Sequence, residues 1–418
     1  MNELAFAAPA KALVPARPAL DTSRFPASAR AALRMLERVE HGSLDVVFPD
    51  GQQYRVGRAA AAAELRLADW TPVEATLRHG DIGFAESYVA GGWSTPDLVR
   101  LLRFFVRNRR ATEAAIYGSV WGNVLHRLRH LLRTNTRAQA RRNIHAHYDL
   151  GNAFYALWLD PTMSYSSALF APAVEAAGAI PDEAALVRGQ HAKYARVLDE
   201  LQLDQPGDVL EIGCGWGGFA EAAARGGHRV TGLTLSPAQL AYAKARLAAQ
   251  HLPARLLRRD YRDEHGRYDA IASIEMVEAV GERYWPQYFA TLHRCLKPGG
   301  RACVQSIVID DALFERYRRG TDFIQQYIFP GGMLPSRTAF EAKARAAGLE
   351  VVSCLVFGRS YAQTLAAWRE RFSRQLNGVR SLGFDERFVR LWTFYLAYCE
   401  AAFAEGNTDV VQYTLVRR

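Results

Sequence analysis

The chain has 418 residues, of which 49% are hydrophobic and 11% aromatic, and its formal net charge is +9. This composition excludes a disordered or fibrous chain, and the length allows two domains. Its five cysteines form no C-x-x-C pair, so the sequence favours neither a disulfide framework nor a metal site and indicates a reducing cytoplasm. No uncharged apolar run reaches the roughly 18 residues that a membrane-spanning helix needs.

The N-terminal part of the chain predicts a tail and then a small domain. Residues 1–30 are rich in alanine and proline and have no continuous apolar stretch, so we expect a flexible tail and not a signal peptide. Leu44–Phe48 and Gln52–Val56 flank an Asp-Gly turn and predict a β-hairpin. With helices expected further on, residues 31–125 are predicted to form a small α+β domain with no catalytic constellation.

The excess positive charge is concentrated between Arg100 and Tyr148, a segment with eleven arginines and one acid, Glu113. Within it, residues 126–145 are expected to form a basic helical linker. Such a helix suits an anionic phospholipid membrane surface, where each basic residue contributes about 1 kcal/mol. We therefore expect a cytoplasmic protein that lies peripherally on the inner face of the membrane.

A solvated helix between domains is the alternative for this basic segment. Nucleic acid is not an expected partner because the segment has few stacking aromatics, and a homodimer is left open.

Residues 146–418 predict one α/β catalytic domain in which strands and helices alternate. Strands are expected at Val209–Ile212, His228–Leu233, Ala254–Leu257, Tyr268–Ile274, Arg301–Val308, Val351–Phe357 and Val410–Val416. An aromatic-rich insertion separates the last two. This order predicts a mostly parallel, Rossmann-like, seven-stranded sheet with helices on both faces and helical insertions. Ligands are expected beyond the carboxyl ends of the strands.

A glycine-rich loop follows the first strand of this domain, where Gly213–Gly218 matches G-x-G-x-x-G. The loop lets the backbone approach a nucleotide-like cofactor beside a helix N-terminus. A dinucleotide site needs an acidic residue about 20 residues later, and no acid occurs between Glu221 and Asp260. Together with Glu211 just before the loop, this favours S-adenosylmethionine (SAM) and the fold of a class I SAM-dependent methyltransferase.

Two further stretches carry candidate functional residues. Ser273–Trp285 (SIEMVEAVGERYW) places Glu275 and Glu278 just after the fourth strand, at the edge where ligands bind. We select Glu278 as an acid/base or orienting carboxylate, with a helix-capping carboxylate as the alternative. Asp322–Ser336 is too apolar and aromatic for an ordinary loop and predicts the wall or lid of a hydrophobic tunnel.

Several motifs together resemble the cyclopropane-fatty-acyl-phospholipid synthases, including the mycolic acid cyclopropane synthases. From about Arg142 to the C-terminus the chain matches HYDLGNAFY, EIGCGWGG, TLSPAQ, DYRD, SIEMVEAVG, YIFPGGMLPS and SYAQTLAAW. The N-terminal domain looks like that of the two-domain bacterial members. The resemblance implies an enzyme that transfers a methyl(ene) group from SAM to the double bond of unsaturated acyl chains in membrane phospholipids, forming cyclopropane fatty acids.

The resemblance also implies two sets of site residues. Together with their neighbours in the loops, the residues expected to bind SAM are Tyr165, Ser166, Glu211, Gly213, Gly215, Trp216, Gly217, Thr234, Ser236, Gln239, Asp260, Tyr261 and Ile274. The family binds bicarbonate beside the transferred methyl, and the matching catalytic positions are Glu278, Ile307, Tyr361, Ser167 and Gln305. Bicarbonate or an equivalent base would take a proton from the carbocation that methyl transfer creates, and the ring would close.

Two of these positions depart from the family pattern, since Ser167 replaces a cysteine and Gln305 a histidine. Both keep hydrogen-bonding capacity but change polarity and protonation. If the base is displaced, a neighbouring proton leaves and gives a methylene- or methyl-branched chain, which is the alternative product. A non-catalytic lipid-binding protein on a methyltransferase fold is the alternative of another class. Cys399 matches a family cysteine once proposed as a nucleophile, and we expect it to pack in the core.

Overall fold

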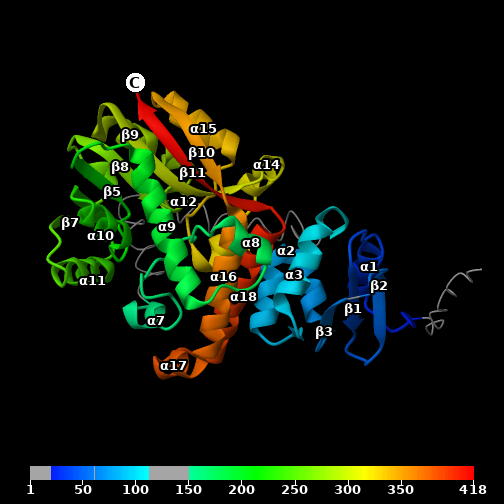
Figure 1. Ribbon diagram of the computed structural model, residues 1–418. Helices are drawn as coiled ribbons and strands as arrows, with labels where there is room; N and C mark the ends of the chain where they lie inside the picture. The colour runs from blue at the N-terminus through cyan, green and yellow to red at the C-terminus, as the bar shows by residue number, and fades with distance from the viewer. Residues whose placement is uncertain (1–19, 61, 113–149) are drawn as a thin grey trace, which may run out of the picture.

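The computed structural model describes residues 20–60, 62–112 and 150–418. The predicted linker at 126–145 and most of the basic segment lie outside the described residues. Two sheets are present in the described part, a four-stranded sheet of order β2-β1-β3-β4 and a seven-stranded sheet of order β10-β11-β9-β8-β5-β6-β7. Figure 1 shows the larger sheet at one end of the molecule and the smaller at the other, with helices α16 and α18 between them.

The N-terminal unit is built on the predicted hairpin. Its elements are α1 (Ala27–Leu36), β1 (Ser43–Val47), β2 (Gln53–Gly57), β3 (Ala63–Leu67), α2 (Thr71–Val89), β4 (Trp93–Ser94) and α3 (Leu98–Arg107). Strands β1 and β2 pair antiparallel with Leu44 opposite Val56, as the Asp-Gly turn predicts. The folded unit begins before residue 30, where we ended the tail, because Phe25 is 2% exposed and its ring packs 4.7 Å from that of Phe48.

The catalytic domain contains the seven predicted strands and confirms the predicted fold class. Its strands are β5 (Asp208–Ile212), β6 (Arg229–Thr234), β7 (Ala254–Arg258), β8 (Tyr268–Ile274), β9 (Leu296–Ile309), β10 (Leu349–Val356) and β11 (Thr408–Arg417). The first five are parallel, and β11 runs antiparallel to both β9 and β10. The strand order reverses at β5, so the carboxyl ends of β5 and β8 flank the topological switch point at which α/β sheets bind ligands.

The catalytic domain contains helices that cover both faces of this sheet and helices that belong to its insertions. They are α7 (Asn152–Ala156), α8 (Pro172–Ala177), α9 (Glu183–Leu201), α10 (Gly218–Arg225), α11 (Pro237–Ala248), α12 (Val277–Val280), α13 (Trp285–Cys295), α14 (Asp311–Arg319), α15 (Arg337–Ala346), α16 (Gly358–Arg374), α17 (Leu376–Ser381) and α18 (Glu386–Ala404). Short 3₁₀ turns lie at Tyr261–Asp263 and Glu282–Tyr284, and a π-helical turn at Ile324–Ile328. No helix among the described residues is long and apolar enough to cross a membrane.

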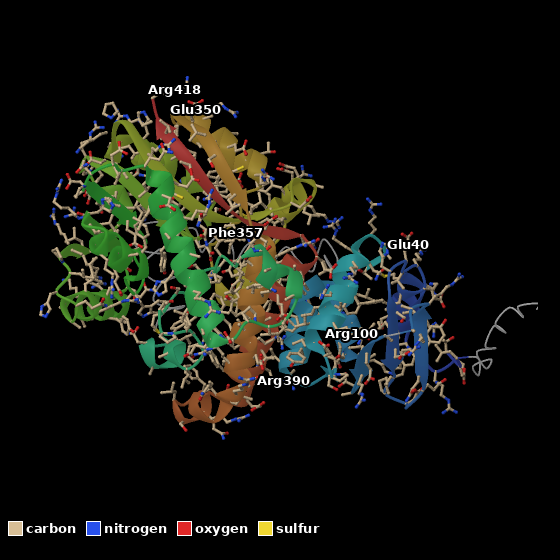
Figure 2. The ribbon with its side chains drawn as sticks, viewed as in Figure 1. Glu40, Arg100, Glu350, Phe357, Arg390 and Arg418 are labelled. Carbon is tan, nitrogen blue, oxygen red and sulfur yellow. The ribbon has the colours of Figure 1, made fainter. Side chains whose placement is uncertain are left out.

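The insertion between β10 and β11 joins the two units through α18. One hydrophobic cluster runs from Phe25 and Trp93 in the N-terminal unit to Phe394 in α18 and Trp368 in α16. At its edge the Arg390 guanidinium donates to the carbonyl of Tyr88 at 2.7 Å and lies 4.2 Å from the centre of that ring. Figure 2 shows Arg390 at this junction, and Phe357 near the middle of the molecule, between β10 and α16. The two units therefore share a core.

Candidate functional site

A cavity of about 180 Å³ lies beyond the carboxyl ends of β5, β6 and β8. Eleven of the thirteen residues expected to bind SAM line it, and these are Tyr165, Ser166, Glu211, Gly213, Gly215, Trp216, Thr234, Gln239, Asp260, Tyr261 and Ile274. Sequence positions up to 109 residues apart thus meet at the predicted edge of the sheet. The remaining two, Gly217 and Ser236, do not line the cavity.

The glycines of the glycine loop have two different structural roles. Gly213, Gly215 and Gly217 all have positive φ, at 89°, 49° and 85°, a region that favours glycine. A Cβ on Gly215 would meet nothing within 4 Å, whereas one on Gly217 would lie 3.0 Å from the Cβ of Ala243. Gly217 therefore lets α11 pack closely. Ser236 has a similar structural role, because its Oγ accepts the N–H of Gln239 at 3.3 Å and caps α11.

The cavity wall contains buried polar atoms that could hold a polar ligand. Oε2 of Glu211 and the hydroxyl of Tyr261 are buried and have no hydrogen-bond partner among the described residues. Burial raises the pKa of Glu211 to about 8. By contrast, the Asp260 carboxylate is already bound by Arg262, at 2.8 and 2.6 Å. Buried polar groups are normally satisfied, so the unpaired atoms of Glu211 and Tyr261 fit a cavity that takes a polar cofactor.

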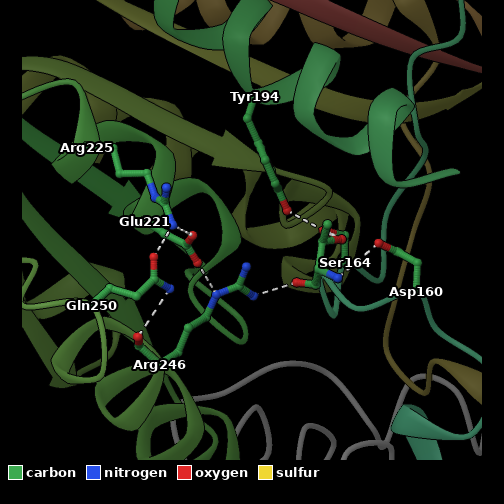
Figure 3. Close-up of polar contacts among 8 residues, drawn as sticks. Asp160, Ser164, Tyr194, Glu221, Arg225, Arg246 and Gln250 are labelled. Carbon is green, nitrogen blue, oxygen red and sulfur yellow. Dashed lines mark hydrogen bonds and ion pairs between the residues drawn. The ribbon is translucent and has the colours of Figure 1, made fainter. Parts of the chain in front are cut away.

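A polar network fixes the loop that brings Tyr165 and Ser166 to the cavity (Figure 3). The hydroxyls of Ser164 and Tyr194 lie 2.6 Å apart. Arg246 on α11 donates to the carbonyl of Thr162 at 2.6 Å and pairs with Glu221 on α10. The loop is thus tied to α9, α10 and α11, the three helices that pack around the glycine loop, and its position is set by the same elements as the cavity.

Three of the five predicted catalytic residues converge on Glu275. Its Oε1 accepts the backbone N–H of Ser167 at 2.9 Å and the Nε2 of Gln305 at 2.7 Å, and its Oε2 accepts the hydroxyl of Tyr361 at 2.8 Å. Glu275 also lines the cavity. The side-chain hydroxyl of Ser167 is turned away and donates to the carbonyl of Ala168 at 2.8 Å.

Glu278, the carboxylate that we selected from the sequence, lies elsewhere. Its Oε1 accepts the backbone N–H of Ile307, and it does not line the cavity. The predicted catalytic residues therefore form two groups, with Glu278 and Ile307 in one and Ser167, Gln305 and Tyr361 around Glu275 in the other. The sequence placed both glutamates after β8 but gave no signal for which of them turns inward.

The two glutamates differ in charge because their surroundings differ. Burial, followed by the charge of Glu275, raises the pKa of Glu278 to about 8. Burial also raises the pKa of Glu275, but the Ser167 N–H and the Lys193 ammonium oppose that rise. We expect Glu275 to carry the negative charge at neutral pH and Glu278 to be protonated, as happens when neighbouring carboxyls have pKa values pushed apart.

Lys193 is a functional candidate that the sequence analysis missed. It is fully buried on α9, and its Nζ donates to the Ser166 hydroxyl at 2.6 Å. Burial lowers its pKa to about 8, while the charge of Glu275 opposes that change. A lysine in a helix normally indicates a solvated face, so the sequence held no signal that this one supplies a buried positive charge beneath the site.

Aromatic rings pack together beside Glu275. The Tyr361 ring lies 4.4 Å from that of Phe403, and the Tyr165 ring lies 5.5 Å from that of Trp368. Phe329, from the predicted apolar wall at 322–336, lies 6.4 Å from Tyr165. Cys399 packs against the same core, and burial raises the pKa of its thiol. A thiol that is kept protonated is a poor nucleophile, in agreement with a packing role.

Comparisons with known proteins identify the family. Residues 135–413 match the family model described as mycolic acid cyclopropane synthetase. The chain is 40% identical to a tuberculostearic acid methyltransferase of Mycobacterium tuberculosis, with 96% of each chain covered. It is 31% identical to a cyclopropane-fatty-acyl-phospholipid synthase of Escherichia coli, over 89% of this chain and 96% of that protein.

A solved structure agrees with these sequence matches. The mycolic acid cyclopropane synthase complexed with SAH and CTAB is 29% identical and matches with a TM-score of 0.60, covering 66% of this chain and 98% of that one. The family model alone spans well over half of the chain. The chain therefore belongs to the mycolic acid cyclopropane synthetase family and is a SAM-dependent methyltransferase.

Proposed function

We propose that the protein transfers a methyl group from SAM to a double bond in an unsaturated acyl chain of a membrane phospholipid. The main support is that Glu275 and Tyr165 lie both at the candidate SAM cavity and beside aromatic side chains. Both line the cavity that contains most of the predicted SAM residues, and each contacts an aromatic residue of the core, Tyr361 for Glu275 and Trp368 for Tyr165. Relatives named as a fatty acid methyltransferase and a phospholipid synthase support a lipid acceptor.

The reactivity of an alkene explains why aromatic side chains suit it as a methyl acceptor. SAM, when bound, supplies a methyl group as a strong electrophile, which an alkene needs because it is a weak nucleophile. Attack leaves a carbocation on the acyl chain. The faces of Tyr165, Tyr361 and Trp368 could stabilise that cation by about 1–2 kcal/mol each once water is excluded. Glu211 and Tyr261 offer the unpaired polar atoms that would hold the cofactor.

Two products can follow from the same carbocation. Loss of a proton from the new methyl group closes a cyclopropane ring, the product that the family model and the Escherichia coli relative support. Loss of a proton from the neighbouring carbon leaves an unsaturated methyl branch, and a 1,2-hydride shift before the methyl group loses its proton gives a methylene branch, so a methylene- or methyl-branched chain is the second candidate. That second candidate is favoured by the match to the tuberculostearic acid methyltransferase, which is 40% identical over 96% of both chains.

A membrane-facing role follows from the proposed substrate. Phospholipid acyl chains lie in a bilayer, so the enzyme has to work at its surface, and we propose the cytoplasmic face. The eleven arginines between Arg100 and Tyr148 would attract anionic lipid there. Salt should weaken such binding, because it screens charges near the surface.

Expression in a bacterial host without its own cyclopropane synthase tests the function. Mass spectrometry of the extracted phospholipids should show unsaturated acyl chains heavier by one CH₂ unit, which an empty vector does not produce. Proton NMR then separates the products, since cyclopropane protons resonate far upfield and methylene protons in the alkene region. The proposal fails if the purified protein binds SAM but no acyl chain gains a carbon.

A further inference from the structure

We infer that Glu275 is the catalytic base of this enzyme. Its carboxylate occupies the position at which the family resemblance predicts a bound bicarbonate. The inference rests on the proposed methyl transfer to an alkene. Its first support is geometric. The Ser167 N–H, the Gln305 amide and the Tyr361 hydroxyl, all at positions expected to bind bicarbonate, donate instead to the two oxygens of Glu275. A carboxylate and bicarbonate present the same pair of acceptor oxygens to such donors.

The donors around Glu275 are themselves fixed. The Oε1 of Gln305 accepts from the Nε2 of Gln412 at 3.0 Å, and the Oε1 of Gln412 accepts from Arg196 at 2.6 Å. The amide of Gln305 is therefore oriented with its NH₂ group towards Glu275. This chain of hydrogen bonds begins at a cation and ends at a carboxylate, so it favours the charged form of Glu275.

The backbone at Glu275 is a second, independent observation. Its φ is +49°, and it is one of four residues other than glycine with positive φ among the described residues. Such a conformation is unfavourable for a residue with a Cβ. The Glu275 N–H donates to the carbonyl of Gln305 at 2.8 Å, which holds the strained backbone in place. Strained residues held by their surroundings cluster at functional sites, and here the strain turns a carboxylate into the cavity.

Glu275 is accessible from the cavity, and its polar neighbours favour the charged carboxylate. Glu275 lines the cavity next to Ile274 and Ser166. Among the described residues its Oε1 accepts two hydrogen bonds and its Oε2 accepts one, so Oε2 keeps a lone pair for a proton. Lys193 beneath it favours the carboxylate form. A carboxylate is a weak base, but it suffices for a carbocation, which is strongly acidic.

The proposed step balances in atoms and charge. The π pair of the alkene forms the new C–CH₃ bond as the sulfonium S–CH₃ bond breaks with its electron pair left on sulfur. Oε2 of Glu275 then accepts a proton from the carbocation formed on the hydrocarbon chain. The freed C–H pair closes the ring if the proton leaves the methyl group, and forms a C=C bond if it leaves a neighbouring carbon. The positive charge of SAM and the negative charge of Glu275 are both neutralised, and Glu275 later releases the proton to water.

Three variants test the assignment with purified protein and unsaturated phospholipid vesicles. Glu275→Gly removes the carboxylate, relieves the positive φ and leaves the three donors free. Glu275→Gln keeps the size of the side chain but cannot accept the proton. Glu400→Gln is the matched control, since it removes another buried carboxylate, bound to Arg369 at 2.7 Å, outside the cavity. Calorimetric SAM titration shows that each variant is folded.

Each protein is assayed in CO₂-free buffer with and without bicarbonate or formate, and binding of ¹³C-bicarbonate is followed separately by NMR. We expect wild type and Glu400→Gln to be insensitive to bicarbonate and not to bind it. Both Glu275 variants should bind SAM but lose roughly 10²–10⁴-fold in turnover, the usual contribution of a general base. Glu275→Gly should bind bicarbonate and regain at least about tenfold in turnover with bicarbonate or formate.

Several results would overturn the assignment. The wild-type protein could lose turnover without CO₂ or could bind bicarbonate. Glu275→Gln could keep a turnover close to that of wild type, or Glu275→Gly could fail to bind bicarbonate. The NMR comparison needs no turnover. If no acyl product forms with any protein, the proposed function fails, while selective bicarbonate binding to Glu275→Gly still shows that the Glu275 carboxylate fills an anion site.

Discussion

At the level of single residues, Glu275 and Glu278 show how one short segment can hold two carboxyls in different protonation states. They lie three residues apart, Glu278 is buried and Glu275 is half-buried, and the charge of Glu275 raises the pKa of Glu278. Glu275 has two side-chain donors, a backbone N–H and a nearby ammonium. Glu278 has the Ile307 N–H, its own N–H and the Ser306 hydroxyl. Among the described residues no ammonium opposes the rise of its pKa, and its Oε2 has no hydrogen-bond partner. The better solvated carboxyl keeps the charge.

This difference predicts how Glu278 affects stability. Its pKa rises from 4.5 in the unfolded reference to about 8 in the folded protein, so between those pH values the folded protein holds a proton that the unfolded chain releases. The free energy of unfolding therefore falls as pH rises through this window, by about 1.4 kcal/mol per unit of pKa difference. Glu278→Gln removes the titration. We expect it to match wild type near pH 5 and to be more stable at pH 9.

Urea unfolding of wild type and Glu278→Gln at both pH values measures this difference. The comparison between the two proteins cancels other titrating groups, including Glu211, whose pKa is also about 8. A difference in unfolding free energy that stays constant from pH 5 to pH 9 would contradict a protonated Glu278.

The glycine loop gives a second prediction at this scale. A Cβ on Gly215 would meet no protein atom within 4 Å, so Gly215→Ala should remain folded while its methyl group projects towards the cavity that Gly215 lines. We expect calorimetry to show SAM binding weakened by at least about tenfold, which is about 1.4 kcal/mol. Gly178→Ala is the control, because Gly178 is also left-handed, at φ +63°, and equally open but lies outside the cavity. Equal SAM affinity in both variants would argue against a cofactor at Gly215.

The sequence predicted the lining of the cavity better than its chemistry. Residues on strand ends, such as Glu211 and Ile274, could be placed because parallel strands end at one edge of a sheet. The inward turn of Glu275 depends on a positive φ that no periodicity reveals. Lys193 is invisible for another reason, since its burial depends on a loop more than 25 residues earlier in the chain.

At the level of elements, Asp81 connects three segments that are distant in sequence. It lies on α2, and its carboxylate accepts the N–H of Phe323 at 3.1 Å and the hydroxyl of Tyr398 at 2.8 Å. Phe323 begins the π-helical part of the wall at 322–336, and Tyr398 belongs to α18. Burial raises the pKa of Asp81 to about 6 and that of nearby Asp322 to about 7. The wall is therefore anchored to the N-terminal unit.

Substitutions of Asp81 should separate hydrogen bonding from charge. Asp81→Ala leaves two buried donors without an acceptor, and each such loss costs about 1–3 kcal/mol. Asp81→Asn keeps an acceptor oxygen and removes only the buried charge. We expect urea unfolding near pH 7 to show Asp81→Ala clearly less stable than Asp81→Asn. Equal stability of the two variants would mean that these contacts do not hold the wall.

Element prediction from the sequence succeeded where signals are local. The Asp-Gly turn gave the hairpin between β1 and β2. Strand β3 was missed because it pairs parallel to β1, from which β2 separates it in the sequence. Helix α2 continues past Gly80, whose φ of +65° bends it, up to Val89. Such long-range pairings and continued helices depend on tertiary packing that a local pattern does not contain.

At the scale of the whole molecule, the apolar face of α18 is completed by the N-terminal unit. Phe394 lies 6.4 Å from Phe84 and from Trp93, ring centre to ring centre. Arg103 and Arg107 on α3 bind Glu405, just after α18, at 2.5 and 2.6 Å. The solved mycolic acid cyclopropane synthase matches 66% of this chain but 98% of its own. A catalytic domain of this type therefore exists with little beyond the matched region, whereas here a shared core links it to a second unit.

Deleting residues 1–112 tests whether the catalytic domain of this chain can stand alone. The deletion removes the partners of Phe394, Arg390 and Glu405. Exposed apolar patches of this kind promote association. We expect the shortened protein to bind a hydrophobic dye, to associate in solution and to unfold at a lower temperature than the full chain. The full chain should unfold in one calorimetric transition, because its two units share a core.

Arg390→Ala supplies a milder version of the same test in the full chain, with Arg380→Ala on the exposed α17 as its control. Arg390 joins α18 to the carbonyls of Tyr88 and Trp93, whereas the side chain of Arg380 binds the exposed Glu386 and no other side chain in the described part of the chain. Loss of a hydrogen bond to a charged donor costs about 1.5–3 kcal/mol, against at most about 1 kcal/mol for a surface ion pair. Arg390→Ala should therefore lower the unfolding temperature by several degrees more than Arg380→Ala. Two separate transitions in the wild-type protein, or a shortened protein as stable as the full chain, would mean that the units fold independently and that the wall at 322–336 does not need Asp81.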